Sequence, residues 1–333
     1  MTNDIKMGDR HATALQLPAR SIPVPTTISP EAQAFLAGGL PIAPPDISHT
    51  DKDAWRAYVA QAEAMMEPIM AARSNAMPAT ISEHRLSNAT LYEITPDVIA
   101  DADADKAILH THGGGFIFGG GRLAAYAAIP MSLATGLRSF SIDYRMPPDY
   151  PFPAGLDDAM EAYRLLLERY APEKIAFEGS SAGANLAAAL ALRARDEGLP
   201  LPGACVLHTA GVDLTDSGDT CVTNTVLDVV LRQPQPEMML LYAGGHDLRH
   251  PYLSPVFADL SKGFPPSILL SGTRDILLSP TVMMHRALLR AGIEAELHVF
   301  EAMPHGGFGH GTPEDCERVE QCARFIALRL AGA

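Results

Sequence analysis

The 333-residue sequence lacks the features that mark several common classes of protein. It has four cysteines and no C-x-x-C pair, which favours the unpaired thiols of a cytoplasmic protein. Its 25 Lys and Arg against 39 Asp and Glu give a net charge of −14, which argues against nucleic acid or an anionic membrane surface as partner. No apolar run reaches the ~20 residues that span a bilayer, and residues 1–20 lack the apolar centre of a signal peptide. We therefore expect a cytoplasmic protein.

Cofactor and metal patterns are missing as well. No G-x-G-x-x-G follows a predicted strand, so we expect no nicotinamide cofactor. His110 with His112, and His246 with His250, are spaced like paired metal ligands, but no third ligand pattern accompanies either pair. The sequence therefore predicts neither a cofactor nor a metal.

From residue 107 onward the sequence alternates between strand and helix patterns. Short apolar runs predict strands, and the amphipathic runs between them predict helices. The expected strands cover about 107–111, 138–143, 174–178, 204–209, 267–271 and 296–300. The expected helices cover about 122–136, 154–170, 182–197, 280–291 and 313–330. This order is typical of an α/β fold with a mostly parallel, doubly wound sheet.

Two segments outside this alternation predict a cap. The first has helical spacing over about 51–73 and follows a short helix near 29–36. The second is the connection 211–266, which should have structure of its own because structureless connections of that length are uncommon. Its helical patterns cover 225–231 and 237–242.

One pentapeptide has the strongest chemical signal. Gly179-Ser180-Ser181-Ala182-Gly183 reads G-x-S-x-G between the strand 174–178 and the helix 182–197. A serine on so tight a turn projects its hydroxyl from the fold, and the helix N-terminus adds partial positive charge where an oxyanion would form. Ser181 is therefore a candidate nucleophile, although a glycine-rich helix cap could have the same sequence.

A serine nucleophile also needs an oxyanion hole. His112-Gly113-Gly114-Gly115-Phe116 follows the strand 107–111, and its glycines let the backbone turn N–H groups toward a substrate. We expect the oxyanion donors to be N–H groups of Gly113, Gly114 and Gly115, together with that of Ala182.

The serine further requires a base and an acid that orients it. Asp275 follows the strand 267–271 and is the candidate acid, although a turn or helix cap would also accept an aspartate there. His305 follows the strand 296–300 and a rigid proline, so it is the candidate base in preference to His310.

With these motifs the chain resembles the hormone-sensitive lipase branch (bacterial family IV) of the α/β-hydrolases, a group of carboxylesterases. The resemblance extends over about residues 81–333 and is carried by His112–Phe116, Asp143–Ala154, Gly179–Asn185, Gly272–Asp275 and Met303–Gly306. It implies an α/β-hydrolase fold with a helical cap, a Ser181–Asp275–His305 triad and a homodimer. The chain departs from the family pattern at Ser180, where the family has Asp or Thr, and at Ala184, where it has Gly.

The resemblance divides the chain and suggests a reaction. We expect N-terminal cap helices over 1–80, a catalytic domain over 81–333 and a second cap element within 211–266. The implied reaction is hydrolysis of small esters with short- to medium-chain acyl groups through an acyl-enzyme. The candidate pocket residues are Phe116, Met65, Met66, Met238 and Met239, although plain packing would explain each methionine.

Two alternatives remain open at this point. The same triad could act on an amide, a carbamate or a lactone, or could transfer an acyl group. A catalytically silent small-molecule receptor of the same fold is the alternative from a different functional class.

Overall fold

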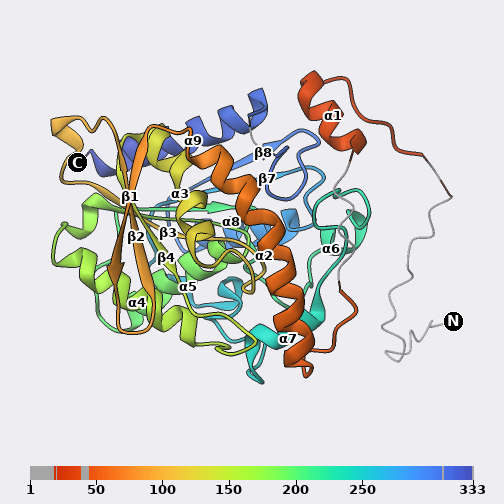
Figure 1. Cartoon of the computed structure of the whole chain (residues 1–333), viewed down its shortest axis with the longest axis horizontal. Helices are drawn as coiled ribbons and strands as arrows, with labels where there is room; N and C mark the ends of the chain where they lie inside the picture. Colours follow the sequence, from red (N-terminus) through yellow and green to blue (C-terminus); the bar gives the residue numbers. More distant parts are fainter. Residues whose placement is uncertain (1–18, 20, 39–44, 310, 332–333) are drawn as a thin grey trace, which may run out of the picture.

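The computed structural model describes residues 19, 21–38, 45–309 and 311–331 (Figure 1). Within these residues an eight-stranded sheet has the order β1-β2-β4-β3-β5-β6-β7-β8. The pairs β1–β2 and β2–β4 are antiparallel and the remaining pairs are parallel. The strands are β1 (Ala79–Arg85), β2 (Thr90–Pro96), β3 (Ala107–Thr111), β4 (Arg138–Asp143), β5 (Ile175–Ser180), β6 (Ala204–His208), β7 (Ser267–Gly272) and β8 (Ala295–Phe300).

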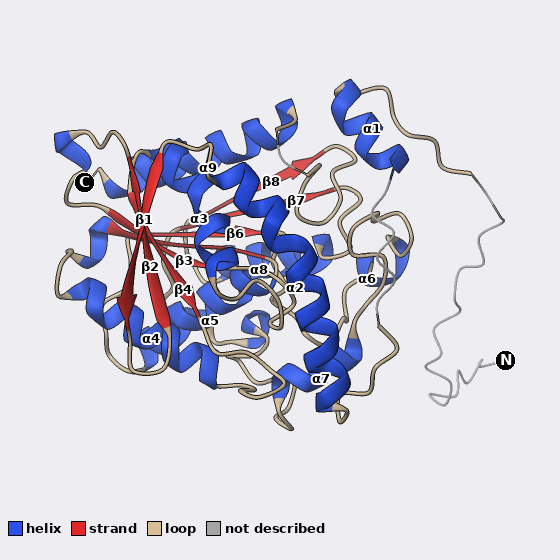
Figure 2. Cartoon of the chain, viewed as in Figure 1, coloured by secondary structure: helices blue, strands red, loops and turns tan. Residues whose placement is uncertain are grey.

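Helices cover both faces of the sheet, as Figure 2 shows with the strands in red. α3 and α9 pack on one face, and α4, α5 and α8 pack on the other. The α-helices of the described chain are α1 (Pro30–Gly38), α2 (Lys52–Ser74), α3 (Arg122–Thr135), α4 (Ala154–Leu167), α5 (Ala182–Asp196), α6 (Thr220–Thr223), α7 (Pro236–Ala243), α8 (Leu278–Arg290) and α9 (Pro313–Leu330).

The central strands are buried along their whole length because both of their faces are covered. Every residue of β3, β6 and β7 is buried. Successive side chains of a strand point to opposite faces, so Ile108 joins the core beneath α9 while Leu109 joins the core beneath α5. This pattern confirms the expected doubly wound α/β fold, and the six expected strands and five expected core helices are all present.

The connection between β6 and β7 differs from the prediction in one place. The expected helix over 237–242 is α7, but 225–231 is a series of turns and not a helix. The Asp228 carboxylate accepts hydrogen bonds from the N–H groups of Val230 and Leu231 (2.9 and 3.0 Å), which gives the backbone an alternative to helical bonding. Val226 also adopts a positive φ of 70°, which ends any helix there.

The N-terminal helices and α7 lie over the end of the sheet where the parallel strands finish (Figure 1). Trp55 of α2 is buried against Ile117, Met238 and Leu241, which joins α2 to α7. α1 packs against the segment that contains Met303 and Phe308. These contacts are those expected of a cap, and we retain the division at residues 80 and 211–266 as a proposal.

Two expectations concern residues that the structure does not describe. The signal-peptide expectation rests on residues 1–20, of which only residue 19 is described, and His310 also lies outside the described residues. None of the described helices combines the length and the apolar character needed to cross a membrane.

Candidate active site

Ser181 lies on a sharp turn between β5 and α5. Its φ and ψ are 58° and −119°, a strained conformation for a residue with a side chain. The two flanking glycines make the turn possible: a Cβ on Gly179 would lie 2.5 Å from the carbonyl carbon of Gly183, and a Cβ on Gly183 would lie 2.7 Å from that of His112. The turn can therefore form only if both positions lack a side chain.

Three predicted residues meet at this turn in one hydrogen-bonded chain. His305 Nε2 lies 2.9 Å from Ser181 Oγ, and His305 Nδ1 lies 3.1 Å from Asp275 Oδ1. Asp275 is fully buried, and its other oxygen accepts a hydrogen bond from Ser271 Oγ (2.7 Å). Because Nδ1 faces a carboxylate, it bears the proton, and Nε2 of the neutral ring is left to accept the proton of the serine.

A fourth side chain at this point was missed by the sequence analysis. Asp228 is fully buried, and the N–H of His305 donates to both of its carboxylate oxygens (3.3 and 3.2 Å). Burial lowers the pKa of His305, but Asp275 and Asp228 outweigh it, so the pKa lies above the ordinary 6.5. Burial also raises the pKa of Asp228, and His305 opposes that change.

The glycine loop after β3 lies beside Ser181. A Cβ on Gly113 would lie 3.6 Å from Ser181 Cβ, so this backbone passes directly over the turn. No described residue accepts a hydrogen bond from the main-chain N–H of Gly113, Gly114, Gly115 or Ala182. Within the described chain these N–H groups therefore have no competing acceptor, and that of Ala182 belongs to the first turn of α5.

His112 holds the start of this loop. Burial lowers its pKa to about 4, so the ring is neutral at neutral pH, and its Nδ1–H donates to Gly113 O at 2.8 Å. The ring stacks on Tyr144 with centroids 4.2 Å apart, and the Tyr144 hydroxyl donates to His112 O (3.0 Å). His112 therefore supports the start of the glycine loop.

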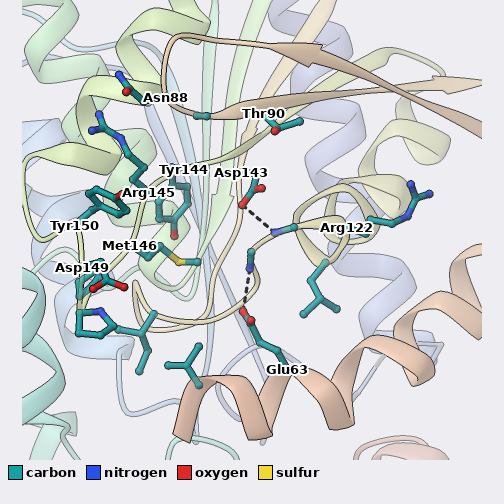
Figure 3. A pocket seen from close by; sticks show the side chains of 18 of the residues that line it. Glu63, Asn88, Thr90, Arg122, Asp143, Tyr144, Arg145, Met146, Asp149 and Tyr150 are labelled. Atoms are coloured by element: carbon teal, nitrogen blue, oxygen red, sulfur yellow. Dashed lines mark hydrogen bonds between the residues drawn. The ribbon is translucent and has the colours of Figure 1, made fainter. Parts of the chain in front are cut away.

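Two carboxylates hold the far end of the same loop. Glu63 of α2 accepts hydrogen bonds from the N–H groups of Gly119 (3.1 Å) and Gly120 (3.2 Å), and Asp143 accepts one from Gly121 (2.9 Å). Figure 3 shows both carboxylates directed at this backbone, at the border of a cleft of about 850 Å³. Burial raises the pKa of both Glu63 and Asp143. Glu63 could not be found from the sequence, because its partners are 56 and 57 residues away.

A buried ionic cluster lies beneath the serine turn. Glu178 of β5 pairs with His110 and with His208, whose Nε2 is 3.2 Å from the carboxylate. Burial alone would raise the pKa of Glu178, but the two histidines hold it well below its ordinary value.

Side chains of the types that can bind a metal come together at one place in the described chain. Asp228, Asp275 and His305 have ligand atoms within 4.8 Å of one another. His305 already uses both ring nitrogens, toward Ser181 and Asp275. The histidine pairs 110/112 and 246/250 belong to no such group among the described residues.

The predicted pocket residues divide into two sets. Phe116 is buried and stacks on Tyr242 with centroids 3.7 Å apart, and the Met238 sulfur lies so close to Gly115 that a Cβ added there would clash with it. Met239 is partly buried and packs against the hydrophobic cluster that contains Met238 and Trp55. Met65 and Met66 are 61% and 43% exposed on α2, so they lie on the outer surface of the helix and do not line an enclosed pocket.

Comparison with known proteins identifies the family. The model of the alpha/beta hydrolase fold matches residues 108–309, more than half of the chain. The chain belongs to the α/β-hydrolase family. An acetyl-hydrolase of Streptomyces hygroscopicus is 32% identical over 242 residues, which cover 71% of this chain and 81% of that protein.

Solved α/β-hydrolase structures agree with the fold. The crystal structure of an esterase, E25, has a TM-score of 0.88 and 32% identity, covering 95% of this chain and 99% of that one. A hormone-sensitive lipase from a metagenome library has a TM-score of 0.77 and 27% identity, covering 90% and 97%. Within the α/β-hydrolases the chain is thus of the hormone-sensitive lipase-like, family IV type.

Proposed function

We propose that this protein is a carboxylesterase in which Ser181 is the nucleophile, His305 the general base and Asp275 the residue that orients the base. The observation that carries the proposal is the continuous chain from Ser181 Oγ through His305 to Asp275, with contacts of 2.9 and 3.1 Å. This is the geometry that a serine needs, since its hydroxyl is a poor nucleophile until a base takes its proton. The related acetyl-hydrolase and esterase support ester hydrolysis as the reaction.

The reaction follows from the direction of the hydrogen bonds. As Ser181 Oγ attacks the carbonyl carbon of the ester, its proton passes to His305 Nε2, and Asp275 stabilises the imidazolium. When the tetrahedral intermediate collapses, the bond from carbon to the alcohol oxygen breaks, and His305 returns the proton to the leaving alcohol. Water, deprotonated by the same His305, then attacks the acyl carbon. The bond from this carbon to Ser181 Oγ breaks, and His305 returns the proton to Ser181 as the acid leaves.

The oxyanion of each intermediate would be held by the glycine loop and the start of α5. The N–H groups of Gly113, Gly114, Gly115 and Ala182 have no acceptor among the described residues, which supports this role. The N-terminus of α5 adds partial positive charge at the same point. In comparable enzymes, loss of one such donor costs about 10²-fold or more in turnover.

The substrate is proposed to be a small ester with a short- to medium-chain acyl group. Phe116, Tyr242 and Met238 fill the space beside the glycine loop, which supports a compact pocket. The name of the acetyl-hydrolase also favours a short acyl group. We further propose a cytoplasmic location, since all four cysteines are free. We also propose a homodimer, as the resemblance to the family implies.

The test is the replacement of Ser181 by alanine, with hydrolysis of p-nitrophenyl butyrate as the assay. The Ser181→Ala variant should be folded and should lose nearly all activity, and a fluorophosphonate should label wild type once per chain but not the variant. The matched control is Ser180→Ala, which alters the same turn at the neighbouring serine and should retain most activity. Hydrolysis by S181A at the wild-type rate would refute the assignment.

An acyl-length series from acetate to palmitate tests the substrate class. The highest kcat/KM should fall on short or medium chains, and highest activity on palmitate would overturn that part of the proposal. Fluorophosphonate labelling without turnover of any ester would instead favour an amide, a carbamate, a lactone or acyl transfer. Absence of labelling would favour a silent receptor.

A further inference from the structure

Asp228 joins three segments of the chain around the base. Its carboxylate accepts the N–H groups of Val230 and Leu231 on its own loop, and that of Ile276, the residue after Asp275, at 3.0 Å. It also accepts the N–H of His305. The contacts to Ile276 and His305 span 48 and 77 residues of sequence.

We propose that Asp228 is a second carboxylate of the active site, a positioning residue that fixes the loops of Asp275 and His305 relative to each other and stabilises the charged form of His305. The inference rests on the proposed function, because it assigns His305 as the base. It adds to the Ser181–His305–Asp275 chain a residue from the segment between β6 and β7.

The geometry supports the positioning role first. Asp275 lies in the segment after β7, and His305 lies in the segment after β8. The 3.1 Å hydrogen bond between their side chains therefore depends on how these two segments are held relative to each other. Asp228 binds the main chain of both segments with one rigid group. A main-chain shift of either loop would therefore have to break a hydrogen bond to a fully buried carboxylate, which is costly.

The charges support the second part of the role. Ligand atoms of Asp228, Asp275 and His305 lie within 4.8 Å of one another, so two carboxylates face one imidazole. The charges of Asp275 and Asp228 raise the pKa of His305. The charge of His305 lowers the pKa of Asp228, whereas that of Asp275 raises it. Both carboxylates are well supplied with donors: Asp275 receives Ser271 Oγ and the N–H of Leu277, and Asp228 receives four N–H groups. Two buried negative charges can therefore persist beside the base.

The decisive variant is Asp228→Asn, which keeps the shape and one acceptor but removes the charge. Without this carboxylate the imidazolium is less stable, so the pKa of His305 falls and the neutral, active base persists to lower pH. We expect the acid limb of the kcat/KM profile for p-nitrophenyl butyrate to move down by about one pH unit, with a loss on the plateau of about tenfold. The pH dependence of fluorophosphonate labelling should move with it, because both report the free enzyme.

Two further variants separate charge from structure. Asp213→Asn is the matched control, since Asp213 is a buried carboxylate of the same connection that accepts the N–H of Thr215 (2.9 Å) and the hydroxyl of Ser217 (2.5 Å). Its acid limb should stay at the wild-type pH even if its thermal stability falls. If Asp228→Asn does not fold, Asp228→Ser keeps an acceptor for the turn without a charge and should show the same downward shift.

The outcomes are distinct from those of the proposed function. If Asp228→Asn, or Asp228→Ser in its place, loses only stability and keeps the wild-type acid limb, Asp228 is a structural acceptor and the inference is wrong. An equal shift in Asp213→Asn would also overturn it. If wild type hydrolyses no ester, or Ser181→Ala hydrolyses it at the wild-type rate, the proposed function itself has failed.

Discussion

Replacement of Gly179 by alanine should damage both the fold and the activity, because it adds one methyl group at the base of the serine turn. The added Cβ would lie 2.5 Å from the carbonyl carbon and oxygen of Gly183 and 2.7 Å from Thr111 Oγ1. Ordinary contact begins at 3.4 Å, so β5 and the start of α5 must separate by about 0.9 Å. The neighbours are mainly backbone atoms, which no rotamer change can move aside.

The size of the effect can be worked out from two opposing terms. Overpacking of a buried site costs about 1–3 kcal/mol, and backbone contacts place Gly179→Ala at the upper end. Loss of glycine flexibility in the unfolded chain offsets about 0.4–1 kcal/mol. We expect a net loss of about 2 kcal/mol, or a Tm lower by about 4 °C. A shift of about 1 Å at Ser181 should reduce kcat/KM by about 10²-fold.

The matched control is Gly211→Ala, measured in the same thermal melts and in the same p-nitrophenyl butyrate assay. Gly211 also contacts Ser181, but a Cβ there would lie 3.5 Å from Ser181 O, which is ordinary contact. Its Tm and kcat/KM should stay close to those of wild type. If Gly179→Ala matched wild type in both quantities, the turn would not depend on close packing and the reasoning would be wrong.

Three further predictions follow from the hydrogen bonds and charges around the site. Asp275→Asn should stay folded and lose about 10⁴-fold in kcat. The acid limb of its pH–rate profile should move to lower pH, because the larger of the two charges that raise the pKa of His305 is gone, and an acid limb at the wild-type pH would contradict this. Glu63→Ala leaves the N–H groups of Gly119 and Gly120 without their acceptor, so urea unfolding should show a loss of about 1–3 kcal/mol, together with a lower kcat; unchanged kinetics would show that the cap does not hold the loop. The pKa of Glu178 in the folded protein is below its ordinary 4.5, so the stability that its charge contributes is present above that pH and is lost as the pH falls. The Glu178→Gln variant should therefore be less stable than wild type at pH 7, and its stability should depend less on pH below about 4.5.

The fold, and the three residues that meet at the serine turn, could be predicted from the sequence alone. Strand and helix patterns are local, because each follows from the spacing of apolar residues within one element. The pentapeptide around Ser181 is equally local, since two small residues are a steric condition for the turn. Asp275 and His305 could be chosen because each follows a parallel strand, and such strands end at the same edge of the sheet.

Only the tertiary structure showed which other side chains support that site. Asp228 lies in a stretch with a helical pattern, and its carboxylate both breaks that helix and reaches main chain 48 and 77 residues away. Glu63 lies on a helix whose spacing reveals two faces but not which one will be covered, and the same spacing suggested a pocket for Met65 and Met66, which are exposed. Contacts between segments distant in sequence leave no periodicity within either segment. They are set by how the cap and the loops pack together, and that packing exists only in the folded chain.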